Sequence, residues 1–497
     1  MQRNKLQPES LGRWVGQATE FRRLLPQLPI ESRSALERSL GDSIETLSAN
    51  PELDCFQVVA QPNRMEPEPA DLRLVWWPNG KPCEVTVGIV SSRLGRNLDD
   101  HRDWFAALRN VVADCAQADF RLVLSPPTFA GPYVARAASL FGAKTLTIQT
   151  PNAVTSLESW IQESRQDHAA RFGANHDSRP AYVSPPISGN PAVADAKDCP
   201  LQDEMVFQLS QRLCAIHVRS GGNIHNRLLT RLVDVHRPPA SVHLRLGSRG
   251  VSPKLRDQLL DAGAVGWATL GWGRLNEQAD VGTSTSMIGD HELAEQTLDR
   301  GGEMADFLTH CTRRRHGPWP EQTEREFLDD LILDRPDAVH SALASLLRIL
   351  KSRKLIATGD TIRGGFPVVS FTEVSAAELQ RLRVFRPHRG RWDFQPYGLS
   401  IRRAWLVDHG CRAVRYAEEH DWKELPDAER PFFQKSTSPT KGGGEIQWTV
   451  EQEWRHPGDI DLECLGGEDA FVFVPNQQAA TAAESFSRWP IRLVSPS

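Results

Sequence analysis

The chain has 497 residues, more than one ordinary hydrophobic core accommodates, so we expect two or three domains. A formal net charge of −5 excludes an overall positive field that would draw the protein onto nucleic acid. Arginine runs at 313–315 and 381–391 are local, and such runs are usually solvated faces. No apolar run approaches the ~20 residues of a membrane-spanning helix, so no membrane partner is expected.

The eight cysteines are widely spread and form no Cys-x-x-Cys pair, so neither a zinc site nor a disulfide framework is expected. Several lie in apolar runs, as Cys214 does, which is typical of reduced core thiols. Residues 2–5 are polar and lead into a polar helix without the apolar core of a secretory signal. The expected location is therefore the cytoplasm.

The N-terminal segment, residues 1–60, is predicted to be helical. Over 1–50, leucine, isoleucine and aromatic residues recur at helical spacing, with a break at Pro26 and Pro29. This pattern favours a helical cap or a dimerising arm. The proline-rich, polar stretch 61–70 reads as a linker.

From residue 71 to 275 short apolar runs alternate with amphipathic stretches. This alternation predicts an α/β domain with a mainly parallel sheet covered by helices on both faces. Only 151–200, which is rich in proline, reads as a loop excursion. The expected strands are 84–90, 121–124, 144–149, 214–218, 242–246 and 265–270, and the expected helices end near 115, 141, 234 and 262.

Two turns of this domain suit a phosphate group. The turns Ser91–Gly95 and Ser220–Asn223 each follow a predicted strand and are predicted to open a helix. Free backbone N–H groups and the helix dipole favour an anion at such places, and Arg93 adds a donor. The alternative is that the glycines only relieve steric crowding. Neither turn is a GxGxxG or Walker motif, so the pattern alone leaves both readings open.

Four segments together resemble the SLOG superfamily of Rossmann-like nucleotide-binding folds, which includes LOG and DprA-like proteins. They are GIVSSRLGR, LSPPTFAGPYVARAA, GAKTLTIQT and HVRSGGNIHNRLL. The resemblance covers about 82–270 and implies that a nucleotide pocket is lined by Ser91, Arg93, Gly131, Gly221 and Gly222. LOG-type hydrolases carry PGGxGTxxE, whereas here Asn-Ile-His-Asn-Arg follows the glycine pair. Without the Thr and Glu, a sensor role is expected and hydrolysis is not.

After a glycine-rich, acidic linker at 276–303, residues 304–497 predict an α+β domain with a mainly antiparallel sheet. Apolar strand-like runs are separated by two amphipathic helices. The expected strands lie at 307–312, 367–371, 400–403, 413–416, 446–448, 454–455 and 470–475, and the expected helices at 321–333 and 342–352.

This domain resembles bacterial ADP-ribosyltransferase-like domains, including abortive phage resistance proteins of the AbiGi type. The matching segments are THCT, ALASLLRILKSRKLIATGD, VVSFTE, WDFQPYGLSIRR, AVRY and EWRHPGDIDL. The resemblance implies a split sheet that grips NAD as a substrate. It also implies that His310 and Thr312 hold the nicotinamide and its ribose, Tyr397 packs on the nicotinamide ring, and Glu453 orients the ribose.

The residue types fit that chemistry. A fixed carboxylate stabilises the positive charge that develops on the ribose when the nicotinamide bond breaks, and it can activate the acceptor. An aromatic ring stacks on nicotinamide, and a neutral histidine hydrogen-bonds a hydroxyl. If 451–453 is a strand, Glu451 and Glu453 point the same way, so either can be the catalytic carboxylate. Ser370 is expected to line the NAD site. Arg402, with Arg403 and Arg455, either binds the pyrophosphate or forms structural salt bridges.

Three functions follow as hypotheses. The first is an ADP-ribosyltransferase effector of stress or phage defence, gated by a nucleotide at the Rossmann-like domain, with a protein or nucleic acid as acceptor. The second is a non-catalytic nucleotide sensor. The third, hydrolysis at the SLOG-like pocket, is disfavoured by the missing Thr and Glu. No metal is expected, and the oligomeric state, including a homo-oligomer, is left open.

Overall fold

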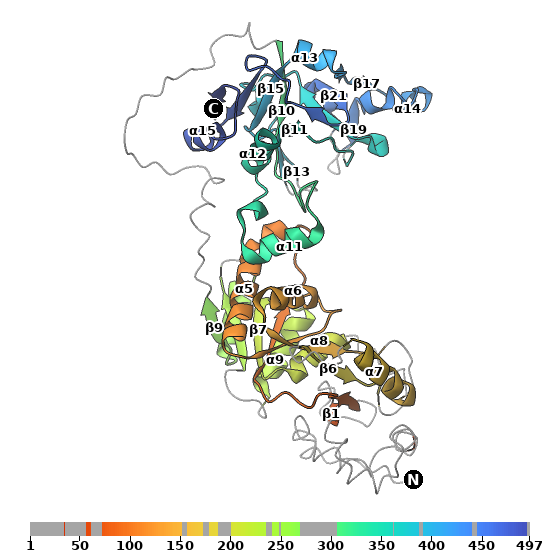
Figure 1. Ribbon diagram of the computed structural model, residues 1–497, viewed down its shortest axis with the longest axis vertical. Helices are drawn as coiled ribbons and strands as arrows, with labels where there is room; N and C mark the ends of the chain where they lie inside the picture. Colours follow the sequence, from red (N-terminus) through yellow and green to blue (C-terminus); the bar gives the residue numbers. More distant parts are fainter. Residues whose placement is uncertain are drawn as a thin grey trace, which may run out of the picture. The chain divides into compact units, whose positions relative to one another are not determined.

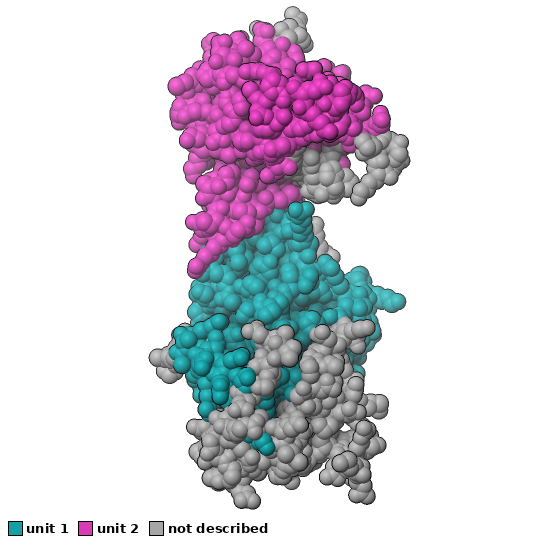
Figure 2. Space-filling model, turned by 90° about the vertical axis from the view of Figure 1, so that its right-hand side faces the viewer, with its two compact units in different colours: residues 1–281, 328–334 teal, residues 282–327, 335–497 magenta. Residues whose placement is uncertain are grey.

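The protein divides into two compact units, coloured separately in Figure 2. Unit 1 comprises residues 1–281 and 328–334, and unit 2 comprises 282–327 and 335–497. The predicted N-terminal helices within 1–50 and the linkers 61–70 and 276–303 lie outside the residues described below. The computed structural model describes residues 34, 56–60, 72–151, 157–171, 178–186, 200–234, 241–247, 250–268, 306–360, 362–386, 391–439 and 445–494.

Unit 1 is built on a nine-stranded sheet with the order β1-β2-β6-β5-β4-β3-β7-β8-β9 (Figure 1). The strands from β6 to β9 are parallel to one another, while β1 and β2 add an antiparallel edge. The prediction of a mainly parallel sheet is confirmed. The strands are β1 (Phe56–Ala60), β2 (Leu72–Trp76), β3 (Thr86–Ser91), β4 (Arg121–Leu124), β5 (Lys144–Gln149), β6 (Ser178–Val183), β7 (Arg212–His217), β8 (Val242–Leu246) and β9 (Val265–Ala268).

The helices of unit 1 cover both faces of this sheet. The chain runs from β3 through β4 to β5 in one direction and from β7 through β8 to β9 in the other. Right-handed crossovers then put the connecting helices on opposite faces. The helices are α5 (Arg102–Gln117), α6 (Gly131–Phe141), α7 (Leu157–Arg171), α8 (Leu201–Leu209), α9 (Asn223–Val233) and α10 (Pro253–Asp261).

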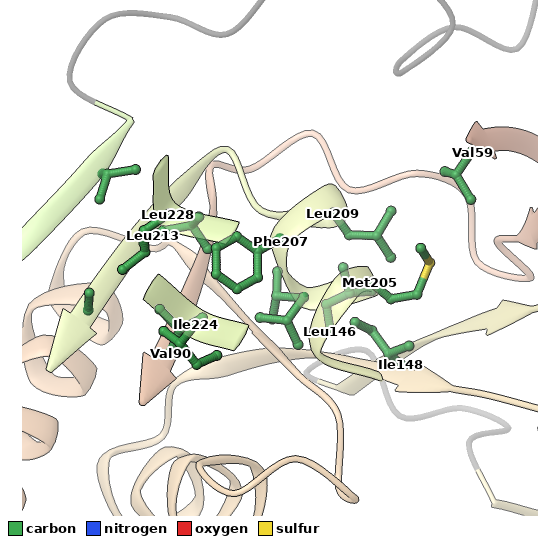
Figure 3. Close-up of a cluster of buried hydrophobic side chains, with 14 of the residues drawn as sticks. Val59, Val90, Leu146, Ile148, Met205, Phe207, Leu209, Leu213, Ile224 and Leu228 are labelled. Carbon is green, nitrogen blue, oxygen red and sulfur yellow. The ribbon is translucent and has the colours of Figure 1, made fainter. Parts of the chain in front are cut away.

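One face of the sheet carries a continuous apolar cluster, drawn in Figure 3. Met205 and Phe207 of α8 and Ile224 and Leu228 of α9 are buried in it, and α10 adds two leucines. These helical side chains pack on strand residues such as Leu213. This packing holds the sheet rigid, and the sheet in turn supports the loops that follow its strands.

Two parts of the prediction for unit 1 are wrong. The stretch 151–200 is not only loop, because α7 and the central strand β6 lie within it. Residues 56–60, expected in the helical segment, form strand β1. Both strands are held by pairing with partners distant in sequence, β6 with β5 and β2, and β1 with β2. Tertiary pairing of this kind overrides local composition.

Unit 2 is built on a seven-stranded sheet with the order β16-β21-β12-β10-β15-β23-β24. All neighbours are antiparallel except β23 and β24, so the prediction of a mainly antiparallel α+β unit is confirmed. The strands are β10 (Phe307–Cys311), β12 (Val368–Thr372), β15 (Gly398–Arg402), β16 (Arg412–Ala413), β21 (Glu453–Pro457), β23 (Ala470–Val474) and β24 (Ile491–Leu493).

The helices and minor strands of unit 2 surround this sheet. Four two-stranded sheets join β11 with β22, β13 with β14, β17 with β18, and β19 with β20. The helices wholly within unit 2 are α12 (Ala342–Ser352), α13 (Arg403–Asp408), α14 (Asp421–Glu424) and α15 (Gln477–Glu484). The boundary between the units falls within α11 (Glu324–Leu333), because its residues from Leu328 on belong to unit 1. The minor strands are β11 (Lys354–Leu355), β13 (Val384–Arg386), β14 (Arg391–Asp393), β17 (Arg415–Ala417), β18 (Phe433–Lys435), β19 (Thr437–Pro439), β20 (Glu445–Gln447) and β22 (Ile460–Asp461).

The two faces of the seven-stranded sheet differ in chemistry. One face, which we call the helix face, carries Leu308, Leu399 and Val472 in a cluster with α12 and α15. Because successive side chains of a strand point to opposite sides, Thr309 and Ser400 lie on the other face, which we call the hydroxyl face. The chemistry of each face decides what it can bind.

The strand expected to hold both Glu451 and Glu453 begins only at Glu453. Glu451 ends a short 3₁₀ helix, Trp448–Glu451, and Gln452 has a φ of 44°. The backbone turn at Gln452 breaks the alternation that the prediction assumed. The expectation that both carboxylates point the same way along one strand is therefore wrong.

Candidate functional site

The order of strands in unit 1 places a switch point between β3 and β7, and we use the word crevice for the region outside the carboxyl ends of these two strands. The chain leaves β3 toward β4 on one side, while β7, β8 and β9 continue on the other side. In open parallel sheets, ligands bind at the carboxyl ends of the two strands where the winding reverses. The turns after β3 and β7, predicted from the sequence to bind phosphate, therefore meet at this switch point.

The two turns are joined by backbone and side-chain hydrogen bonds. The N–H of Ser92 donates to the carbonyl of His217 at 2.7 Å, and the N–H of Arg219 donates to Ser92 Oγ at 3.0 Å. The pairing register shifts between Val90 and Ser91, so that Ile216 is an extra residue of β7. Such a bulge re-aims the chain at the end of a strand and is common beside functional sites.

The turn after β7 runs into the N-terminus of α9. Gly221 has a φ of 71°, a conformation that favours glycine, and Gly222 is the N-cap residue. No side chain caps the helix there, so its first-turn N–H groups keep their capacity to bind an anion. A Cβ at Gly222 would meet only the carbonyl of Arg219, at 3.5 Å. The packing around residue 222 would therefore accept a larger side chain, whereas the positive φ of residue 221 favours glycine there.

Three buried donors near this crevice have no hydrogen-bond partner among the described residues: Ser125 Oγ, Arg245 Nε and His225 Nε2. Ser125 directly follows β4, and Arg245 lies near the end of β8, so they flank β3 and β7 at the carboxyl edge. His225 accepts from the N–H of Gly221 through Nδ1, which puts the proton of a neutral ring on Nε2. Unpaired buried donors are costly unless a ligand or water satisfies them.

Charges of both signs lie at this edge. Burial and the charge of Arg219 lower the pKa of His217, while Asp103 acts in the opposite direction. Arg245 pairs with Asp103 at 3.1 Å and is almost fully buried. His101 also lies close enough to His217 to lower its pKa. The guanidinium groups of Arg219 and Arg245 are cations near the turn after β7, and Asp103 is the acidic partner of Arg245.

Ser91, the last residue of β3, lies buried next to the turn after this strand. Its hydroxyl is buried, accepts a hydrogen bond from Trp104 Nε1 at 3.0 Å and donates to the carbonyl of Ser92 at 2.8 Å. The indole of Trp104 lies 5.5 Å from the ring of Tyr133 and 6.1 Å from that of Phe129. The latter two side chains are half-buried, so aromatic surface borders the carboxyl edge.

The turn Ser91–Gly95 does not open a helix directly, contrary to expectation, because the chain turns helical only at Leu98. Gly95 instead donates its N–H to His101 Nε2. Arg93 is exposed. Burial raises the pKa of Asp203 in α8, and the positive charge of Arg93 acts in the opposite direction on the same pKa. Arg93 therefore lies toward α8, beside the crevice.

Gly131, also predicted to line the pocket, closes the turn between β4 and α6. Its N–H donates to Thr128 Oγ1 at 3.1 Å, and a Cβ would lie 2.0 Å from the carbonyl oxygen of Ser125. Only glycine fits there. The steric requirement explains this glycine without a ligand, although its helix starts at the same edge of the sheet.

In unit 2 the predicted catalytic residues separate into two groups. His310, Thr312 and Tyr397 lie on the helix face. The ring of His310 lies 5.7 Å from that of Phe371, and Thr312 Oγ1 donates to the carbonyl of Ala342 at 2.9 Å. The N–H of Thr312 donates to the carbonyl of Tyr397 at 2.8 Å. Thr312 is thus in contact with Tyr397 and lies two residues from His310 in the chain, and a role of the three in binding nicotinamide stays a prediction.

His310 is a neutral imidazole. Burial lowers its pKa to about 4, with the charge of Arg313 acting in the same direction and a hydrogen bond to the carbonyl of Ser370 opposing it. Its Nδ1 lies 2.9 Å from that carbonyl, which can only accept, so Nδ1 carries the proton. Nε2 is then left as an acceptor, which suits a hydroxyl donor.

Glu453 lies on the hydroxyl face. It pairs with Thr372 across β21 and β12, and Thr372 pairs with Thr309 of β10, so the three side chains share a face. His310, one residue after Thr309, points to the other side. The sheet thus separates Glu453 from the group of His310, while Ser370 shares the hydroxyl face with Glu453.

The carboxylate of Glu453 forms a two-pronged ion pair with the guanidinium of Arg455, at 2.9 and 2.7 Å. Arg455 is 1% exposed and also donates to the carbonyls of Pro431 and Phe433. The N–H of Glu453 donates to the hydroxyl of Tyr416. The pairing of Glu453 with Arg455 is the structural alternative weighed from the sequence. The contacts of Arg455 with the carbonyls of Pro431 and Phe433 could not be predicted, because they depend on the tertiary fold.

The sheet is open between β10 and β12. These central strands pair at one position only, Thr309 with Thr372, whereas β10 and β15 pair at five. The imidazole of His310 hydrogen-bonds to the carbonyl of Ser370 at the place where the backbone pairing of β10 with β12 ends. This partial separation is the feature of unit 2 that most resembles the expected split sheet.

The arginines considered for the pyrophosphate are all paired with carboxylates. Arg402 contacts Asp469 at 2.9 Å and Arg403 contacts Glu373 at 2.6 Å. The structural salt bridges weighed as the alternative are thus present in this conformation, and a pyrophosphate role for Arg402 stays a prediction.

Other groups of the described residues add no site. No cluster of three or more His, Cys, Asp or Glu among them could hold a metal ion. Within the same residues, no helix is both long and apolar enough to cross a membrane. Of the cysteines there, Cys115 and Cys411 are buried, but Cys83 and Cys464 are exposed thiols.

No protein-family model and no curated protein matches this chain. Among solved structures, DNA processing protein A from Streptococcus pneumoniae is 13% identical over 53% of this chain and 95% of its own, with a TM-score of 0.27. DNA processing protein A from Helicobacter pylori is 9% identical over 42% and 90%, with a TM-score of 0.25. The molybdenum cofactor carrier protein from Chlamydomonas reinhardtii is 14% identical over 37% and 88%, with a TM-score of 0.23. With TM-scores this low, no functional conclusion rests on these likenesses.

Proposed function

We propose that unit 1 binds a nucleotide in the crevice between β3 and β7, and that the protein acts as a nucleotide-responsive sensor or regulator. The phosphate lies at the uncapped N-terminus of α9, after Gly221 and Gly222. The observation that carries the proposal is the set of buried, unpartnered donors at the switch point, namely Ser125 Oγ, Arg245 Nε and His225 Nε2.

The chemistry of the crevice favours a phosphorylated ligand over a neutral one. Backbone N–H groups, the helix dipole and the exposed guanidinium of Arg219 all favour an anion. The half-buried rings of Phe129 and Tyr133 offer a surface on which a base can stack. A nucleotide combines both requirements.

The test compares AMP, ADP-ribose and NAD with adenosine, which lacks the phosphate, by calorimetry on the full chain. Gly222→Asp places a carboxylate at the helix N-cap, where aspartate stabilises a helix but repels a phosphate. Gly222→Asn is the matched control with a similar shape and no charge. We expect Gly222→Asp to weaken binding about tenfold more than Gly222→Asn, with both variants folded.

Two results would count against the nucleotide site. Binding of adenosine as tight as that of AMP would remove the role of the phosphate. Failure of all three phosphorylated compounds to bind the wild type would remove the site.

For unit 2 we propose a second candidate function, ADP-ribosyl transfer from NAD. It is favoured by the opening between β10 and β12, bordered by the neutral imidazole of His310 and by Ser370. In this proposal Glu453 acts from the hydroxyl face as the carboxylate that stabilises the ribosyl cation. His310, Thr312 and Tyr397 act from the helix face by positioning the nicotinamide end.

The transferase proposal is tested by incubating labelled NAD and a cell lysate with the full chain, beside Glu453→Gln and His310→Ala. Transfer of label by the wild type and its loss in Glu453→Gln would support the proposal, provided that the variant is folded at the assay temperature. Absence of label transfer and of nicotinamide release, with AMP present or absent, would leave the sensor as the function.

A further inference from the structure

The hairpin of β13 and β14 in unit 2 exposes two aromatic rings side by side. Phe385 and Trp392 are directly opposite each other in the register, so they share a face. Their ring centroids lie 5.4 Å apart, and the side chains are 44% and 41% exposed. Among the large apolar residues that are exposed in the described structure, the only other aromatic one is Phe486.

The same hairpin is strongly basic. Residues 381–391 contain five arginines and one histidine and no acidic residue, although the whole chain has a net charge of −5. The guanidinium of Arg383, which is exposed, lies 4.9 Å from the ring centroid of Trp392. Arg381 is 79% exposed and pairs with Glu378 on the same turn. Positive charge and aromatic surface therefore coincide.

The residues just before and just after the hairpin pack into a buried cluster and hold the hairpin in place. Leu379, just before the hairpin, is 2% exposed and packs with Phe471 and Phe473 of β23. Phe394, just after the hairpin, packs against the same cluster. These buried contacts on the hydroxyl face of the sheet hold the hairpin that carries Phe385 and Trp392. The two side chains therefore lose little conformational entropy when a ligand binds.

We propose that this hairpin binds single-stranded nucleic acid. Bases stack on Trp392 and Phe385, and backbone phosphates contact Arg383 and Arg381. Every base has a π-face, so stacking of this kind works without sequence preference. A duplex hides those faces, and an acidic peptide offers charge but no aromatic ring at every unit, which is why a single strand fits this surface best.

The test measures binding of fluorescent oligodeoxythymidylate and oligouridylate, roughly ten nucleotides long, to the full chain. Trp392→Ala is expected to weaken binding of either strand about 5- to 150-fold, with partial recovery in Trp392→Phe. Phe486→Ala is the matched control, because it removes an equally exposed ring outside the basic segment, and it should leave affinity unchanged.

The charge contribution has its own readout. Arg383→Gln should lower the slope of log affinity against log salt by about 0.7, the value for one phosphate contact on a single strand. Gly222→Asp, in the other unit, should leave oligonucleotide binding unchanged, so failure here is distinguishable from failure of the nucleotide site.

Three outcomes would overturn the inference. These are no binding of either oligonucleotide by the wild type, equal binding of a duplex of the same length, or unchanged affinity in a folded Trp392→Ala variant. Loss of self-association in Trp392→Ala, with no oligonucleotide binding by the wild type, would assign the surface to a second copy of the chain instead. A difference between the two oligonucleotides would tell whether RNA or DNA is preferred.

Discussion

The backbone N–H of Arg219 donates to the hydroxyl of Ser92 at 3.0 Å, across the junction where the sheet of unit 1 reverses its winding. Ser92 belongs to the half that continues into β4, and Arg219 to the half that continues into β8. This contact fixes the two loops that form the crevice. Its removal should therefore loosen the candidate site without affecting the core beneath it.

We predict that Ser92→Ala weakens AMP binding about fivefold, the cost of about one neutral hydrogen bond, because Arg219 loses the partner that orders the loop. Calorimetry measures the affinity. Ser252→Ala is the control, since that hydroxyl caps no helix N–H and lies in the loop before α10. Equal affinities of wild type and Ser92→Ala would show that this contact does not shape the site.

Gly131→Ala should destabilise unit 1 by about 1–3 kcal/mol, because the added Cβ would lie 2.0 Å from the carbonyl oxygen of Ser125. Gly222→Ala is the matched control, since its Cβ would meet its nearest atom at 3.5 Å. Chemical denaturation should show a lower midpoint for the first variant and a change within about 0.5 kcal/mol for the second. A wild-type midpoint for Gly131→Ala would contradict the packing described for this turn.

Glu453→Gln should destabilise unit 2 by about 3 kcal/mol, because it leaves the guanidinium of Arg455 buried without its counter-charge. Glu373→Gln breaks the more exposed pair with Arg403 and should cost less than about 1 kcal/mol. Thermal unfolding followed by circular dichroism distinguishes the two. Similar small costs would mean that the Glu453–Arg455 pair is not needed for the fold. Any loss of NAD chemistry in Glu453→Gln must be read at a temperature where the variant is folded.

The stability of unit 2 should depend on His310 at acidic pH. Burial lowers the pKa of His310 from 6.5 to about 4, so the unfolded chain takes up a proton more readily than the folded one. The stabilising contribution of the neutral ring is fully present above about pH 6.5 and is lost progressively as the pH falls toward about 4. His310→Gln should therefore show a weaker decline of unfolding free energy over that range than the wild type. Parallel curves for the two proteins would contradict a buried neutral His310.

Much of the architecture could be predicted from residue patterns. Strands β4, β5 and β8 and helix α12 have the predicted bounds, because each is a clear apolar run or an amphipathic stretch between turn residues. Strand β6 could not be predicted, since Pro180 lies inside it and its place in the sheet comes from pairing with β5.

The candidate sites were predicted less completely. The Ser220–Asn223 turn, which lies at the switch point, could be predicted from the sequence, because the order of strand, glycine turn and helix is local information. The separation of His310 from Glu453 could not be predicted, since it depends on the register that pairs Thr309 with Thr372 and Thr372 with Glu453. The role of Arg245 and Ser125 also depends on which strands become neighbours.

The most direct test of the nucleotide site is amide hydrogen exchange of the full chain with and without saturating AMP. The account predicts slower exchange in peptides covering 91–95 and 219–226, the two turns that meet at the end of β3 and β7, and no change around His310 and Glu453. Protection confined to peptides of unit 2, with 219–226 unaffected, would contradict it.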